Sequence, residues 1–212
     1  MSVVGIIPAG GSGERLGASG PKAFAVLAGK PMLEWSLAAL GGVCDRVVVA
    51  VPEGYEDPPD RVRGGRSRSA SVRHALAAAP EATVAIVHDA ARPLVTRELV
   101  ERCLHGLDGC EAAIAAARMT DTVKEDDGAG RVVRTLARER LWSVQTPQVF
   151  RADVLRSALD VAEERLAAAT DDASLVEEGG GSVRLVEAPP DNLKVTTALD
   201  LQVAEAILRS RC

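Results

Sequence analysis

Short apolar runs rich in valine, isoleucine and alanine recur along this chain and alternate with segments of helical periodicity. The runs predict strands at residues 3–7, 46–51, 83–88, 111–117 and 182–187. The other periodic segments predict helices at residues 31–40, 69–79, 96–107, 151–169 and 197–209, the last opened by a capping box at 197–200. Apolar strands separated by helices are typical of a parallel sheet covered on both faces. We therefore expect an α/β fold with a mostly parallel sheet.

The composition limits the classes of function. A chain of 212 residues is long enough for one domain spanning residues 1–212, and its core must be aliphatic because only 2% of the residues are aromatic. The net charge of −5 and the scarcity of aromatic rings argue against a nucleic-acid partner. Arginines at positions 61, 63, 66, 68 and 73 do gather in one region, and Arg61 and Arg63 are expected on a solvated helix face.

The cysteines and the hydropathy pattern bear on location. Cys44, Cys103, Cys110 and Cys212 form no CxxC pair, which indicates reduced thiols in a cytoplasmic protein. No apolar run approaches ~18 residues, and the N-terminus lacks a basic region. We therefore expect neither a membrane partner nor export.

Residues 118–145 interrupt the alternation of strands and helices. Two short β-rich runs, 122–124 and 131–135, flank a polar, glycine-rich turn at 125–130 and predict a hairpin inserted into the domain. A projecting hairpin has too little core to stand alone. We expect this β-arm to pack on a second subunit as a dimerisation element, and a surface loop is the alternative.

The first predicted strand runs into a glycine-rich loop. Its sequence is Pro8-Ala9-Gly10-Gly11-Ser12-Gly13-Glu14-Arg15-Leu16-Gly17, and Pro21-Lys22 follow. Glycines let backbone N–H groups approach a polyphosphate, and the cations Arg15 and Lys22 can neutralise its charge. The spacing fits neither the dinucleotide fingerprint GxGxxG nor the P-loop, which requires Gly-Lys-Ser/Thr. The loop indicates a phosphate site of another kind.

Two more polar clusters lie where predicted elements end or begin. Residues 88–93 (His88-Asp89-Ala90-Ala91-Arg92-Pro93) end a strand, and residues 64–72 (Gly64-Gly65-Arg66-Ser67-Arg68-Ser69-Ala70-Ser71-Val72) open a helix. Ligands of open parallel sheets bind outside the carboxyl ends of the strands, so these clusters and the glycine loop are expected to converge. Asp89 could coordinate Mg²⁺, hold a ribose hydroxyl, or only bond to its own loop. Arg92 could simply pair with Asp89.

The C-terminal half supplies the motifs 142–148, 170–174 and 191–196. Alone, Thr170 would be a helix N-cap and Lys194 an ordinary surface lysine. The ordered set of motifs, however, resembles the 2-C-methyl-D-erythritol 4-phosphate cytidylyltransferase family of the non-mevalonate isoprenoid pathway over essentially the whole chain. The resemblance is carried by the glycine loop with Pro21-Lys22, Gly64-Gly65-x-x-Arg68-x-x-Ser71-Val72, residues 88–93, Asp121-Thr122, Trp142, Thr146-Pro147-Gln148, Thr170-Asp171-Asp172-Ala173-Ser174 and Asp191-Asn192-Leu193-Lys194-Val195-Thr196.

The resemblance implies a Rossmann-like nucleotidyltransferase sandwich of three layers, a homodimer joined by the β-arm, CTP and a polyol phosphate as substrates, and Mg²⁺ as cofactor. The implied catalytic residues are Arg15, Lys22, Arg138 and Lys194. The implied nucleotide-binding residues are Pro8, Ala9, Gly10, Gly11, Gly13, Gly65, Ser71, Asp89 and Ala90, with Asp89 also near Mg²⁺. The implied contacts to the polyol phosphate are Arg92, Thr122, Thr146, Thr170 and Asp191. Thr122 and Arg138 would reach the partner's site from the arm.

Three alternatives remain at this point. A ribitol 5-phosphate cytidylyltransferase would share the nucleotide motifs, and a nucleotidyltransferase for another sugar phosphate or for molybdopterin would share the glycine loop. A non-catalytic nucleotide-binding regulator would need neither Lys22 nor Lys194, because a sensor stabilises no transition state. Two positions depart from the family pattern: Arg66 stands where an acidic residue is frequent, which leaves base selectivity open, and Asp172 stands where glutamate is common.

Overall fold

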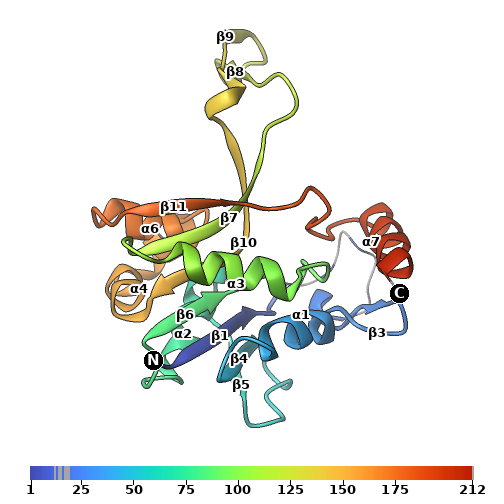
Figure 1. Cartoon of the computed structure of the whole chain (residues 1–212), viewed down its shortest axis with the longest axis vertical. Coiled ribbons are helices and arrows are strands. Elements are labelled where there is room, and N and C mark those ends of the chain that lie inside the picture. Colours follow the sequence, from blue (N-terminus) through green and yellow to red (C-terminus); the bar gives the residue numbers. More distant parts are fainter. Residues whose placement is uncertain (12, 14–15, 17–19, 212) are drawn as a thin grey trace.

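The computed structural model describes residues 1–11, 13, 16 and 20–211. Within them, a seven-stranded sheet with the order β11-β7-β10-β6-β1-β4-β5 forms the centre of the molecule (Figure 1). The strands are β1 (Val3–Pro8), β4 (Arg46–Val51), β5 (Arg61–Arg63), β6 (Val84–Val87), β7 (Ala112–Arg118), β10 (Trp142–Arg151) and β11 (Val183–Glu187). β10 is antiparallel to both of its neighbours, and the remaining described pairings in this sheet are parallel. The mostly parallel sheet predicted from the sequence is thus confirmed.

Helices cover both faces of the sheet. They are α1 (Met32–Gly41), α2 (Arg68–Ala77), α3 (Arg97–Gly106), α4 (Ala152–Leu159), α5 (Glu163–Ala168), α6 (Asp172–Glu178) and α7 (Ala198–Arg211). Because side chains alternate along a strand, Val3 and Ile7 of β1 share a core cluster with α1 and α3. Val4 and Ile6 share the opposite cluster with α2, α4, α5 and α6. The result is the expected three-layer α/β sandwich (Figure 1).

A smaller unit beside the sheet carries α7. The short strand β2 (Val26–Leu27), which pairs with the antiparallel β3 (Lys30–Pro31), lies against this helix, and Leu27, Ala204 and Leu208 belong to one buried cluster. The capping box that opens α7 is confirmed, because Asp200 N–H donates to Thr197 Oγ1 (3.2 Å) and Thr197 N–H donates to the Asp200 carboxylate (2.8 Å). Among the described residues, none of the helices combines the length and apolarity that crossing a membrane requires.

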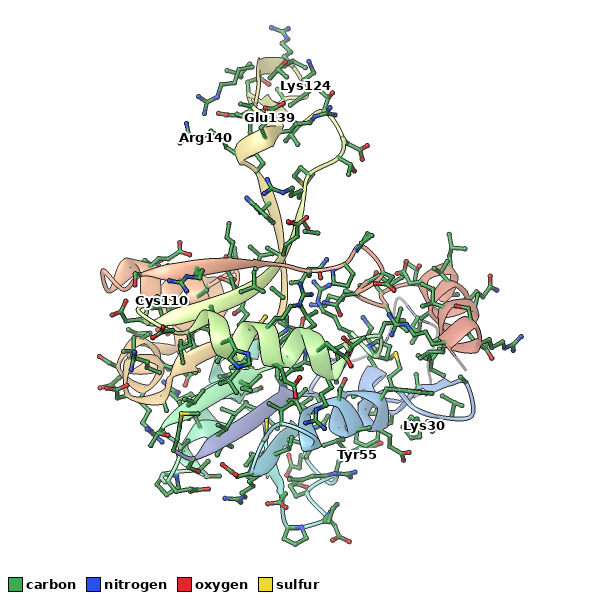
Figure 2. All side chains as sticks on the ribbon, viewed as in Figure 1. Lys30, Tyr55, Cys110, Lys124, Glu139 and Arg140 are labelled. Carbon is green, nitrogen blue, oxygen red and sulfur yellow. The ribbon has the colours of Figure 1, made fainter. Side chains whose placement is uncertain are left out.

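A long arm rises from the sheet between β7 and β10 (Figure 1). Its tip contains the antiparallel pair β8 (Lys124–Asp126) and β9 (Val132–Thr135), within the segment where the sequence predicted a hairpin. A 3-10 helix, Arg138–Arg140, lies on the arm, and Figure 2 shows Lys124, Glu139 and Arg140 well above the sheet. At the base of the arm Arg118 pairs in register with Trp142, and its guanidinium lies 4.3 Å from the centroid of the indole ring.

Two expectations about elements are wrong. The single helix predicted at 151–169 is broken between α4 and α5, where the Val161 carbonyl accepts a hydrogen bond from Arg73 of α2 (3.2 Å) and α5 packs against α2. Arg61 and Arg63 lie on strand β5 and not on a helix face, because residues 61–63 pair with β4.

The central strand β10 was also not expected. Pro147 lies within it, but the register shifts between Val144 and Gln148, so no ladder hydrogen bond is demanded of the proline.

Candidate active site

A cavity of about 560 Å³ opens at the carboxyl ends of β1 and β6, beside the N-terminus of α2. Of the residues predicted for the site, it is lined by Pro8, Gly10, Gly11, Gly13, Lys22, Gly65, Ser71, Asp89, Ala90 and Lys194. The structure adds Leu16, Arg66, Ser67, Arg68, Ala91 and Thr196 to the lining. The three polar clusters and the segment of Lys194 therefore converge on one cavity, at the edge where open α/β sheets bind ligands.

The glycine loop forms one wall of this cavity. Gly13 has φ +77°, and a Cβ there would lie 2.9 Å from the Gly20 carbonyl oxygen and 3.2 Å from the Lys22 nitrogen, so the loop can fold back only around glycine. The Lys22 N–H donates to the Gly11 carbonyl (2.9 Å), which brings Lys22 to the cavity. At Gly10 and Gly11 a Cβ would meet nothing within 4 Å, so these two residues face open space. Arg15, predicted to be catalytic, lies outside the described residues.

The start of α2 forms the opposite wall. Gly65 packs so closely on α2 that a Cβ would lie 2.5 Å from the Ala70 Cβ. Its N–H donates to Ser71 Oγ (3.1 Å), and the Ser71 hydroxyl in turn donates to the Ser67 carbonyl (2.9 Å). Ser67 caps the helix by accepting from the Ala70 N–H (3.1 Å). Ser71 thus fixes the Gly64-Gly65 turn, and the wall is the positive end of a helix dipole, which favours an anion.

Asp89 is the only acidic side chain among the described residues that line the cavity, against the cations Lys22, Arg66, Arg68 and Lys194. Arg68 Nε donates to Asp89 Oδ1 (2.8 Å), and Lys194 Nζ donates to Asp89 Oδ2 (2.7 Å). Burial would raise the pKa of Asp89, but the two cations outweigh it and hold that pKa far below its usual value. The carboxylate stays ionised, and the described part of the lining keeps a positive excess that suits a polyphosphate.

A buried relay fixes Asp89 from behind. The Asp89 N–H donates to Thr146 Oγ1 (3.0 Å), and the Thr146 hydroxyl lies 3.0 Å from His88 Nδ1. The other ring nitrogen of His88 lies 3.2 Å from the Arg92 carbonyl. Burial lowers the pKa of His88 to about 4, so its ring is neutral at physiological pH. A neutral ring that donates from Nε2 and accepts at Nδ1 satisfies every contact in this relay.

Comparison with known proteins assigns the family. A sequence profile of 2-C-methyl-D-erythritol 4-phosphate cytidylyltransferase matches residues 3–210. The 2-C-methyl-D-erythritol 4-phosphate cytidylyltransferase of Nocardia farcinica is 44% identical over 99% of this chain and 95% of its own length. The crystal structure of the Thermus thermophilus enzyme of that name superposes with a TM-score of 0.84, at 39% identity over 99% of this chain and 100% of that chain. The chain belongs to the 2-C-methyl-D-erythritol 4-phosphate cytidylyltransferase family.

A further relative and a further structure agree. The 2-C-methyl-D-erythritol 4-phosphate cytidylyltransferase of Deinococcus radiodurans is 45% identical over 95% of this chain and 88% of its own length. The 4-diphosphocytidyl-2C-methyl-D-erythritol synthase of Anaerococcus prevotii is 28% identical and superposes with a TM-score of 0.83 over 98% of each chain. Both likenesses extend over nearly the whole cytidylyltransferase fold.

Several residues predicted from the family motifs lie away from the cavity lining. Thr122 and Arg138 are exposed on the arm, where Arg138 Nη1 donates to the Thr120 carbonyl (2.6 Å). Asp191 pairs with Arg211 of α7 (2.8 Å), and Ala9 is buried under the glycine loop, its N–H bonded to the Ala50 carbonyl.

Two local expectations about capping and pairing are corrected. Thr170 does not cap a helix; Asp171 caps α6, because its carboxylate accepts from the Ser174 N–H (3.0 Å) whereas Thr170 is exposed. Arg92 does not pair with Asp89, whose oxygens contact Arg68 and Lys194; Arg92 Nη1 donates instead to the Asn192 carbonyl (2.8 Å).

Sequence analysis assigned no role to two charged residues of this cytidylyltransferase site. Arg68 reaches the cavity and also contacts Asp172 through Nη1 (2.5 Å), and the Asp172 side chain is fully buried. Both residues stand in the motifs that carried the resemblance, but their contact spans elements far apart in the chain. Arg66 lines the cavity beside Gly65, which places the departure from the family pattern at the site itself.

The described residues fit a divalent cation only in part. They contain no cluster of three or more His, Cys, Asp or Glu side chains that could hold a metal ion. Asp89 offers a carboxylate in the cavity, and Mg²⁺ prefers such oxygens together with substrate phosphates and water. Each Asp89 oxygen already accepts one hydrogen bond from a cation and retains a lone pair. The donor set therefore fits Mg²⁺ that is held mainly by a triphosphate, with Asp89 as one protein ligand.

Proposed function

We propose that this protein transfers the cytidylyl group of CTP to 2-C-methyl-D-erythritol 4-phosphate. The products are 4-diphosphocytidyl-2-C-methyl-D-erythritol and pyrophosphate, in the synthesis of isoprenoid precursors. The observation that carries the proposal is the cavity at the strand ends, which is bordered by a glycine loop and a helix N-terminus. Its described lining contains one carboxylate, that of Asp89, together with the cations Lys22, Arg68 and Lys194. The family assignment supplies the substrates, since the matched relatives are named for this reaction.

The chemistry requires charge neutralisation rather than a general base. An oxygen of the polyol phosphate attacks the α-phosphorus of CTP; a new phosphorus–oxygen bond forms, and the bond to the β-phosphate bridging oxygen breaks. The second pKa of a phosphate monoester is about 6, so the nucleophile is already ionised at neutral pH. Lys22 and Lys194 both line the cavity and are assigned to the phosphates, where charge on the transferring group is stabilised.

The nucleotide and the metal have distinct positions in this proposal. Gly65 and Ser71 border the pocket for cytosine, and the glycine loop faces the triphosphate. Mg²⁺, when bound, neutralises phosphate charge, with Asp89 as the protein carboxylate in reach. Arg66, next to the cytosine pocket, is the residue that we expect to tune base selectivity.

We also propose a homodimer in which the arm of one subunit reaches the site of the other. Thr122 and Arg138 belong to the arm, which projects away from the sheet (Figure 1), and neither is among the described residues that line the cavity. Val132 and Val133 at the tip are 62% and 60% exposed, an apolar surface that a partner would cover.

A cytoplasmic location is supported by the free thiols of Cys44, Cys103 and Cys110.

The test measures pyrophosphate release with CTP and Mg²⁺, with 2-C-methyl-D-erythritol 4-phosphate and ribitol 5-phosphate as parallel acceptors and mass detection of the product. We expect the higher kcat/KM with the methylerythritol phosphate. A higher value with ribitol 5-phosphate would make the acceptor wrong and leave the reaction class intact. Binding of CTP without turnover of either acceptor would favour the regulator. Repeating the assay with UTP measures base selectivity beside Arg66.

A further inference from the structure

Four charged side chains form a network of ion pairs that extends from the protein interior to the cavity: Asp172, Arg68, Asp89 and Lys194. Asp172, the first residue of α6, accepts from Arg68 Nη1 (2.5 Å). Arg68 Nε donates to Asp89 Oδ1 (2.8 Å), and Lys194 Nζ donates to Asp89 Oδ2 (2.7 Å). The signs alternate along the network, and Asp172 is the member that does not line the cavity.

The position of Asp172 requires an explanation. Its side chain is 0% exposed, and its Oδ1 has no hydrogen-bond partner among the described residues. A buried carboxylate is unfavourable unless it is well paired, and replacing a buried ion pair as a whole by apolar residues is often neutral. Its partner in the described structure is Arg68, whose guanidinium is a planar fork that can join two carboxylates in a fixed geometry. The role that the structure offers for the Asp172 carboxylate is therefore to hold the guanidinium of Arg68.

The consequence falls on Asp89. With one end of the fork held by Asp172, Arg68 presents Nε to Asp89 Oδ1 and leaves Oδ2 to Lys194. Without Asp172, the guanidinium could rotate toward the cavity, compete with Lys194 for both oxygens, or bind a substrate phosphate itself. Asp89 and Lys194 would then lose their defined positions.

We propose that Asp172 is a positioning residue, which acts through Arg68 to hold Asp89 and Lys194 in the arrangement that cytidylyl transfer requires. This inference rests on the proposed function. It assigns a part in the reaction to a side chain that does not itself line the cavity.

The experiment compares Asp172→Asn with the matched control Asp171→Asn. Both changes remove one negative charge at the start of α6, but Asp171 contacts Ser174 N–H and Gln148 Nε2 and not Arg68. Asparagine can still cap the helix. Gln148 Oε1 is unpartnered in the described structure, so a flip of that amide would preserve the contact between residues 148 and 171.

We expect kcat of Asp172→Asn to fall about 10–100-fold, because misplacement of about 1 Å at reacting groups costs up to 10²-fold. CTP, titrated calorimetrically, should bind at least as tightly as to the wild type, since the site gains one net positive charge. Asp171→Asn should retain kcat within about twofold. Weaker CTP binding with unchanged kcat, or equal losses in the two variants, would overturn the proposal.

The neutral double variant Arg68→Gln with Asp172→Asn covers the case in which Asp172→Asn fails to fold, because it leaves neither charge buried alone. If the two residues act as a unit, the double variant should lose no more kcat than Arg68→Gln alone. Multiplied losses would refute the coupling. The wild-type assay separates the two proposals: absence of pyrophosphate release from the wild type refutes the proposed function, whereas active wild type with the wrong variant pattern refutes this inference alone.

Discussion

Replacing Thr146 by valine keeps the shape of a buried side chain and removes its hydroxyl. That hydroxyl accepts from the Asp89 N–H and contacts His88 Nδ1, both at 3.0 Å, and Thr146 is only 4% exposed. The family resemblance predicts a contact between Thr146 and the polyol phosphate, whereas the structure shows the hydroxyl engaged by the protein. The substitution therefore distinguishes a ligand contact from support of the strand end that carries Asp89.

The magnitude follows from the two groups that lose their partner. A buried donor or acceptor left unsatisfied costs about 1–3 kcal/mol, so the Asp89 N–H and His88 Nδ1 together should lower the free energy of unfolding by about 2–6 kcal/mol. For a protein of 150–250 residues, each kcal/mol corresponds to roughly 2–4 °C in Tm. We therefore expect a fall in Tm of roughly 4–24 °C in the absence of substrates.

The assay is thermal and urea unfolding of the ligand-free protein, followed by steady-state kinetics. Thr170→Val serves as the control for stability, because Thr170 is exposed and should leave Tm unchanged. We expect Thr146→Val to lose stability and to lower kcat through the displaced Asp89. A wild-type Tm combined with a raised KM for the polyol phosphate would refute the reasoning and restore the direct contact.

Three other predictions concern the site, the arm and acid stability. Lys22→Ala should lower kcat roughly 10²–10³-fold with an unchanged circular dichroism spectrum, and a near-normal kcat would exclude its role in transfer. The Lys22→Ala and Arg138→Ala proteins should each be nearly inactive. When an equal mixture of the two is unfolded and refolded, about one quarter of the sites should be active, because half the dimers are mixed and each mixed dimer holds one intact site. Activity that stays at the parental level, with mixed dimers verified by mass spectrometry, would place Arg138 in its own subunit's site. Burial lowers the pKa of His88 from 6.5 to about 4, so the unfolded chain binds a proton first as the pH falls. The stability that neutral His88 contributes is complete above pH 6.5 and should decline by about 2 kcal/mol at pH 5, measured by urea unfolding; an unaltered pH profile in His88→Gln would contradict this.

The parallel part of the fold was predictable because its signal is local. Strands such as β4 and β6 are buried on both faces and read as unbroken apolar runs, and their predicted ends lie within about two residues of the observed ones. Strand β10 carries no such signal. Its buried Gln145 and Gln148 are compensated by Asn192 (2.8 Å) and Asp171 (2.7 Å), partners that only the folded chain brings near. Because polar side chains interrupt its apolar pattern, the segment shows no periodicity typical of a strand, and long-range hydrogen bonds make it a core strand.

The candidate site likewise has a part that could be predicted from local sequence and a part that depends on contacts between distant residues. The glycine loop and the Gly64-Gly65 turn could be found because backbone geometry demands glycine within a few residues. The family motif includes Arg68, but its role could not be inferred from the sequence, since that role depends on a contact with Asp172, 104 positions away. The family resemblance named Lys194 and Asp89, but their direct ion pair is a property of the fold. Roles shared between two chains, as proposed for Arg138, are still predictions.

The junction between the arm and the sheet has a consequence for protein engineering. β7 and β10 are antiparallel neighbours, and their pairing continues to the hydrogen bond from the Met119 N–H to the Leu141 carbonyl (3.2 Å). The chain therefore leaves the sheet and returns to it at adjacent points. A two-residue hairpin turn could join the strands there in place of residues 120–140. The arm can therefore be removed or exchanged without cutting the sheet. A trimmed chain would leave the nucleotide pocket on a smaller scaffold, and in the proposed homodimer an arm taken from a relative is expected to change which subunits pair.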